Sequence, residues 1–82
     1  MYDSLSMQRL QPGMAVFGIR GRRVGKVGTI YHDCFEVVRE KADGGPICLT
    51  PESIFTVEAR EVTLVCEKTD VERYRCPQHT PA

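Results

Sequence analysis

Cys76 and His79 are the only pair of soft metal ligands separated by two residues in the sequence. Together with His32 or another cysteine, they could hold zinc in a tetrahedral site. Structural zinc sites normally show two such close pairs, and this chain has one. We therefore expect no metal and no cofactor. Cys76 is the best candidate for an exposed, oxidisable thiol, because Arg73 and Arg75 favour its thiolate. An unreactive thiol is the simpler interpretation.

Three further cysteines, Cys34, Cys48 and Cys66, lie in or beside apolar runs. Four cysteines in a secreted chain would suggest two disulfides. The N-terminal residues lack the basic start and apolar core of a signal peptide, so we expect a cytoplasmic protein of bacterial type. Thiols stay reduced in that compartment. We therefore expect these three cysteines to be buried as small hydrophobic residues.

A cluster of positive charge falls between positions 20 and 26. It contains Arg20, Arg22, Arg23 and Lys26. At the tip of a hairpin these side chains could contact phosphate groups, with Phe17 and Tyr31 stacking on bases. Four charges would give weak, salt-sensitive binding. The whole chain has 11 basic and 11 acidic residues, so no overall field attracts nucleic acid. Weak RNA or DNA binding is therefore the alternative function.

The sequence gives no basis for assigning catalytic residues. Glu36 and Glu40 share a strand face about 13 Å apart, at roughly 3.3 Å per residue, too far for a glycosidase pair. His32 and Asp33 are adjacent, and adjacent side chains of an extended chain point apart. A small barrel is filled by its own side chains and leaves little pocket. We therefore expect that the chain is not an enzyme.

Turn signals and alternation predict one domain with six short strands. We expect an N-terminal arm over residues 1–11, a barrel over 12–67 and a flexible tail over 68–82. No apolar run approaches the roughly 20 residues of a membrane span. Gly25 and Gly28 lie where a barrel wall must bend, and Thr50-Pro51 predicts one helical turn. The predicted core contains Val16, Val24, Val27, Ile30, Phe35, Val37, Leu49, Val57, Val62 and Leu64.

Several short motifs lie within this predicted framework. They are Gly13-Met14-Ala15-Val16, Gly21, Val24-Gly25-Lys26-Val27, Thr50-Pro51 through Val57, and Val62-Thr63-Leu64. Over residues 10–67 they resemble the PRC-barrel family, and most of all its short, stand-alone bacterial members of unknown function. Arg20 stands where the family usually has Asp. The resemblance implies an all-β fold: a small six-stranded antiparallel PRC-like β-barrel with one short helical turn. It implies no catalytic residues, because the family is known for assembly and interaction.

The expected function is a non-catalytic protein-interaction or assembly module. We expect it to bind a protein partner or a second copy of itself, as a homodimer, through a free strand edge. Alternation places Phe17, Val38 and Phe55 opposite the predicted core, so these three are the expected interface. A redox- or metal-responsive switch through Cys76 and His79 is a third hypothesis.

Overall fold

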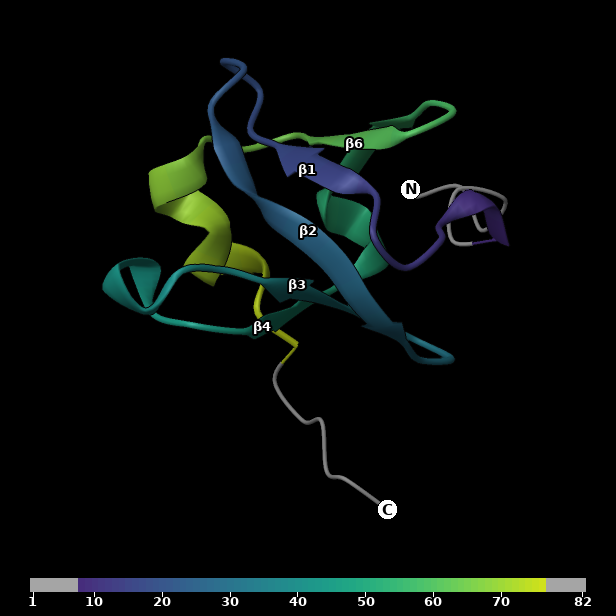
Figure 1. The fold of residues 1–82 in the computed structure, drawn as a ribbon, viewed down its shortest axis with the longest axis horizontal. Coiled ribbons are helices and arrows are strands. Elements are labelled where there is room, and N and C mark those ends of the chain that lie inside the picture. Colours follow the sequence, from purple (N-terminus) through teal and green to yellow (C-terminus); the bar gives the residue numbers. More distant parts are fainter. Residues whose placement is uncertain (1–7, 77–82) are drawn as a thin grey trace.

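The fold is described from a computed structural model, which places residues 8–76. The strands, shown in Figure 1, are β1 (Ala15–Phe17), β2 (Arg23–Ile30), β3 (Phe35–Val38), β4 (Ile47–Leu49), β5 (Ile54–Val57) and β6 (Glu61–Leu64). Three 3-10 helices are found within 8–76: η1 (Lys41–Asp43), η2 (Pro51–Ser53) and η3 (Lys68–Tyr74). The six predicted strands are confirmed. η2 starts at the Pro that predicts it.

The strands form one mixed sheet in the order β4-β3-β2-β1-β6-β5. Four neighbouring pairs are antiparallel, whereas β1 and β6 run parallel, with Val16 opposite Val62. The prediction of a purely antiparallel sheet is therefore wrong. The physical reason is that β2 occupies one side of β1, and the hairpin of β5 and β6 returns along the other side in the direction of β1.

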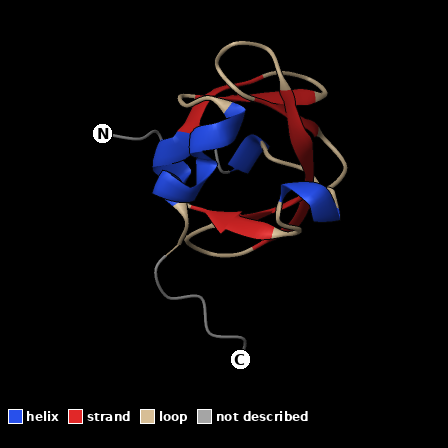
Figure 2. Ribbon diagram, turned by 90° about the vertical axis from the view of Figure 1, so that its left-hand side faces the viewer, coloured by secondary structure: helices blue, strands red, loops and turns tan. Residues whose placement is uncertain are grey.

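The sheet curls into an open half-barrel, because its edge strands β4 and β5 do not pair with each other. The segment after η3 lies along β4 instead. The backbone N–H of Thr50 donates to the carbonyl of Tyr74 at 2.9 Å, and that of Cys76 donates to the carbonyl of Cys48 at 2.8 Å. Figure 2 shows most of the helical segments on the left, where the ring of strands is open, and one on the opposite side beside the strands. The expected small β-barrel is therefore an open half-barrel.

η3 differs from the expectation of a flexible tail from residue 68 onward. Val71 projects from η3 into the core and is only 2% exposed. The end of the expected N-terminal arm also contributes to the core, since Leu10 is buried there. Each of these residues is a single apolar residue among polar neighbours in the sequence, so no periodic pattern marks it as buried. Residues 1–7 and 77–82 of the expected arm and tail lie outside the described residues.

The core prediction from alternation is confirmed except at Ile30, which is half-buried against the core rather than within it. Met14 and Ile47 join the predicted residues. The strand β2 bends sharply, and a side chain at Gly25 would overlap the carbonyl oxygen of Val38. Glycine is required there because two backbones approach closely. No helix among residues 8–76 is long and apolar enough to cross a membrane.

Candidate functional site

One outer face of the sheet carries a group of apolar and threonine side chains, bordered by the carboxylate of Glu61. Val16, Val62 and Val57 are paired across β1, β6 and β5 and are buried. Side chains alternate along a strand, so the next residues of these strands face outward. We call these residues and their neighbours the outer patch, and it consists of Phe17, Ile19, Phe55, Thr56, Thr63 and Val65.

The exposed fractions of its side chains agree with this definition of the outer patch. Ile19 is 44% exposed and Val65 is 38% exposed. The backbone N–H of Ile19 donates to the carbonyl of Cys66 at 2.9 Å, which holds Ile19 beside Val65. Phe17, Ile19 and Thr63 line one shallow hollow together with the acidic residue Glu61. The outer patch therefore joins side chains from two strands that are distant in the sequence.

Phe55 is the most exposed large apolar side chain of the described chain, at 61%. It lies on the edge strand β5, at an irregularity where Ile54 pairs with Leu64 and Thr56 pairs with Thr63. A bulge leaves one extra residue unpaired and redirects side chains. Phe55 therefore points to solvent rather than inward. A bulge also weakens pairing of a further strand, so contacts here would rely on side chains.

Val38 is exposed as predicted, but it lies elsewhere. It sits at the end of β3, opposite Lys26 of β2, and is 37% exposed. Its surroundings are the charged residues of a groove that also contains Arg39 and Glu40. The structure therefore brings Phe17 and Phe55 to one face of the sheet and places Val38 on a separate, charged surface.

The basic hairpin is divided between two surroundings. Arg20 makes an ion pair with Glu67, and Arg22 lines a small hollow with them. Arg23 folds back so that its Nε donates to the carbonyl of Gly25 at 3.1 Å. The four predicted basic residues therefore do not form one free cluster of charge.

Lys26 and Arg23 instead line an open groove of 580 Å³ with two cations from distant segments, Arg39 and Lys68. Glu40 and Asp43 line the same groove, and Lys68 approaches Asp43 at 3.4 Å. Four positive and two negative charges give the groove a net positive lining. Its volume is large because it is open to solvent.

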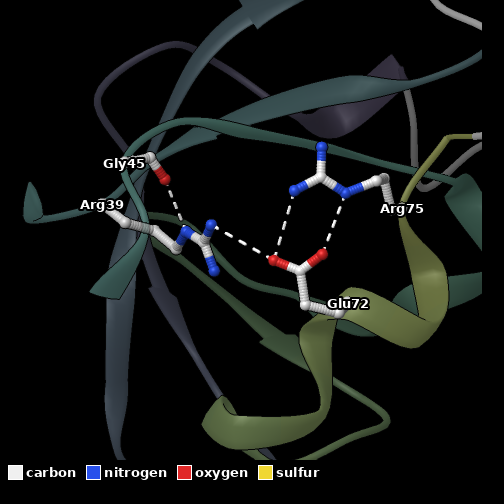
Figure 3. A network of polar contacts seen from close by, with 4 residues as sticks. All are labelled: Arg39, Gly45, Glu72 and Arg75. Atoms are coloured by element: carbon white, nitrogen blue, oxygen red, sulfur yellow. Dashed lines mark hydrogen bonds and ion pairs between the residues drawn. The ribbon is translucent and has the colours of Figure 1, made fainter. Parts of the chain in front are cut away.

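A buried arginine connects the sheet to η3 (Figure 3). The side chain of Arg39 is only 5% exposed, and its Nε donates to the carbonyl of Gly45 at 2.6 Å. Its other end approaches Glu72, which also accepts two hydrogen bonds from Arg75, at 2.9 and 3.2 Å. The hydrogen bond from Arg75 is the main reason that the pKa of Glu72 is lowered. Alternation places Arg39 on the strand face of the buried Phe35 and Val37, but the network was not foreseen, because its contacts with Gly45 and Glu72 join distant segments.

The four cysteines differ in how deeply they are buried. Cys34 is buried as predicted, whereas Cys48 and Cys66 are half-buried. Cys76, the expected exposed thiol, is also half-buried. Burial raises the pKa of Cys34 to about 12, and raises the pKa of Cys48 and of Cys66. All three are therefore protonated thiols at neutral pH.

His32 is exposed at the turn before β3, and His79 lies outside the described residues. Among residues 8–76, no group of three or more His, Cys, Asp or Glu side chains is arranged to hold a metal ion. No family model, curated protein sequence or solved structure matches the chain. The candidate sites therefore rest on the geometry of this chain alone.

Proposed function

We propose that the chain is a non-catalytic interaction module of the PRC-barrel type that associates through its outer patch, with a second copy of the chain as the partner. The observation that carries the proposal is Phe55, a large aromatic side chain 61% exposed at the edge of the sheet. Aromatic side chains are enriched at the centres of interfaces, where they become fully desolvated.

Three properties of the outer patch favour a second copy. Its apolar and threonine side chains carry no charge themselves, and Glu61, which lines the same hollow, places a carboxylate at their border. A twofold dimer uses the same surface on both chains. The chain as a whole is neutral, which leaves little long-range repulsion between copies. The resemblance to a family known for assembly adds a fourth argument.

The oligomeric state tests this proposal. The molar mass of the full chain is measured by light scattering after size exclusion at about 100 μM, for wild type, Phe55→Asp and Val38→Asp. We expect a dimer for wild type and for Val38→Asp, and a monomer for Phe55→Asp, because burying a charge in an apolar interface is costly. Val38 is the matched control, since it is apolar and exposed but lies away from the outer patch.

A monomeric wild type would contradict self-association. A dimer that survives Phe55→Asp would contradict the outer patch as the interface. Far-ultraviolet circular dichroism of each variant confirms that the fold is kept, and Phe55 is exposed enough for the substitution to be tolerated.

Weak nucleic-acid binding is the second candidate function, and the cation-lined groove favours it. Lys26 and Arg23 would contact phosphates there, whereas the buried Arg39 is bound to Gly45 and Lys68 is paired with Asp43. Retention on heparin that falls steeply with salt, and that is reduced by Lys26→Gln but not by Phe55→Asp, would support this function. A wild-type chain that is not retained on heparin even at low salt would contradict it.

A further inference from the structure

Three cysteines from distant parts of the sequence meet on one side of the sheet. Cys34 precedes β3, Cys48 lies in β4, and Cys76 follows η3. The bridge between Leu49 and Arg75 sets an antiparallel register in which Cys48 and Cys76 are directly opposite. The hydrogen bond from the N–H of Cys76 to the carbonyl of Cys48, at 2.8 Å, holds this register.

The side chains of the three cysteines share a face. Phe35 and Leu49 are paired and fully buried, so the residues beside them point to the opposite face of the sheet. Those neighbours include Cys34 and Cys48. The Cys34 thiol takes part in side-chain hydrogen bonds with Cys76 and with Cys48. Cys34 therefore lies between the other two thiols and in contact with both.

We propose that Cys34 and Cys76 form a thiol–disulfide exchange site. A small-molecule disulfide of the oxidised glutathione class oxidises the two thiols, and they become linked by an intramolecular disulfide. In the first step the Cys76 thiolate attacks one sulfur of the small disulfide and breaks its S–S bond. One half of the small molecule leaves as a thiolate, and the other half stays on Cys76 as a mixed disulfide. In the second step Cys34 attacks the Cys76 sulfur and displaces the second small thiolate. The two thiol protons end on the two released thiols, so two cysteines are oxidised as one small disulfide is reduced.

Cys76 is the first nucleophile because it is accessible. It is half-buried, whereas Cys34 is completely buried and cannot meet a small-molecule disulfide directly. Cys34 meets the mixed disulfide only because its thiol already contacts that of Cys76. A link between Cys34 and Cys48 would join two strands that are already neighbours, whereas a link to Cys76 fastens the segment after η3 to the sheet.

The surroundings of Cys34 make the second step dependent on pH. In the reduced chain burial raises the pKa of Cys34 to about 12, and the hydrogen bond with Cys76 adds to this rise. In the mixed disulfide Cys76 has no thiol, so burial is the main remaining cause that raises the pKa of Cys34, with Cys48 and Asp33 nearby. Only the thiolate attacks a disulfide. The thiolate fraction of Cys34 therefore grows about tenfold for each pH unit below its pKa. At pH 7 the mixed disulfide on Cys76 is expected to accumulate first, and at pH 9 the internal disulfide is expected to replace it rapidly.

The test uses the reduced full chain incubated with oxidised glutathione at pH 7 and pH 9. Samples are quenched with acid and analysed by intact mass and by peptide mapping without reduction. We expect a linked peptide pair containing Cys34 and Cys76, formed faster at pH 9 and reversed by excess thiol. Cys66→Ser is the matched control and should give the same linked pair, because Cys66 follows β6, away from the other three.

Stability supplies a second readout that does not depend on variants. A disulfide closing a loop of about 40 residues should raise the melting temperature by about 10–30 °C. The proposal is overturned by a Cys34–Cys48 linked pair in place of the Cys34–Cys76 pair. It is also overturned by a mixed disulfide on Cys76 that persists at pH 9, by no reaction, or by an unchanged melting temperature of the oxidised chain.

Discussion

Arg39 and Glu72 lie 33 positions apart in the chain, and their side chains meet at 3.5 Å between Nη2 and Oε2. The two ends of this contact differ greatly in environment, since the Arg39 side chain is 5% exposed and the Glu72 side chain is 57% exposed. A long ion pair at the surface contributes little. The 2.6 Å hydrogen bond from Arg39 to the buried Gly45 carbonyl is therefore the stronger anchor.

We predict that Arg39→Met lowers the free energy of unfolding by about 1–3 kcal/mol, because the buried Gly45 carbonyl loses its donor. The measurement is urea unfolding at pH 7. Arg22→Met, at an exposed position of the hairpin, is the control and should stay within about 0.5 kcal/mol of wild type. Equal losses for the two variants would show that the Arg39 contacts are not the cause.

Glu72 should contribute to stability only above acidic pH. Its pKa is lowered from the ordinary value of 4.5, first by the hydrogen bond from Arg75. A carboxylate with a lowered pKa stabilises the folded chain above its unfolded pKa, and this contribution disappears as the pH falls through the folded value. We expect Glu72→Gln to melt below wild type at pH 7 and to match it at strongly acidic pH. A gap between the melting curves that does not change with pH would contradict this assignment.

Two glycines of β2 should respond differently to the same substitution. A methyl group at Gly25 would overlap the carbonyl oxygen of Val38, which is fixed backbone, whereas at Gly28 it would meet the Glu36 carboxylate at the end of a flexible side chain. We predict that Gly25→Ala costs about 1–3 kcal/mol or more in urea unfolding. Gly28→Ala should cost clearly less. A reversed order would mean that the approach of β2 to β3 is looser than described.

Leu64 and Val65 are adjacent and lie on opposite faces of the sheet. Leu64 is fully buried, whereas Val65 is 38% exposed. We predict a loss of about 2–5 kcal/mol for Leu64→Ala. Val65→Ala should stay within about 0.5 kcal/mol of wild type. Thermal and urea unfolding at one pH compare the two directly, and a Leu64→Ala loss under about 1 kcal/mol would contradict the burial of this face.

Alternation of apolar residues and turn dipeptides were sufficient to predict most of the strands and most of the core residues. The alternation of Val62, Leu64 and their neighbours follows from burial of one face, and the turn dipeptides mark the ends of strands. The parallel pairing of β1 with β6 was not predictable in this way, because alternation is the same for parallel and antiparallel neighbours. Pairing partners depend on contacts between distant segments, which a single sequence does not display.

The candidate sites were also predictable only where local alternation decides the direction of a side chain, and not where distant segments meet. Phe17 and Phe55 were predicted to face outward, and they do, but the separation of Val38 depends on how the sheet curves. Ile19 and Val65 were missed because they lie beyond the strand ends, where alternation no longer decides orientation. The meeting of Cys34 with Cys76 depends on the packing of η3 through Val71, a single apolar residue among charged neighbours.

The parallel pair of β1 and β6 also governs how the chain reaches its folded state. Ala15 of β1 pairs with Glu61 of β6, so this ladder closes a loop of 46 residues from its first partner to its second. Such a closure costs roughly 3 kcal/mol of chain entropy before any hydrogen bond of the ladder repays it. The hairpins β1–β2 and β5–β6 close much shorter loops, so they can form early. Their docking is then the slow event, which gives this small chain the millisecond-to-second folding typical of sheets with distant pairings.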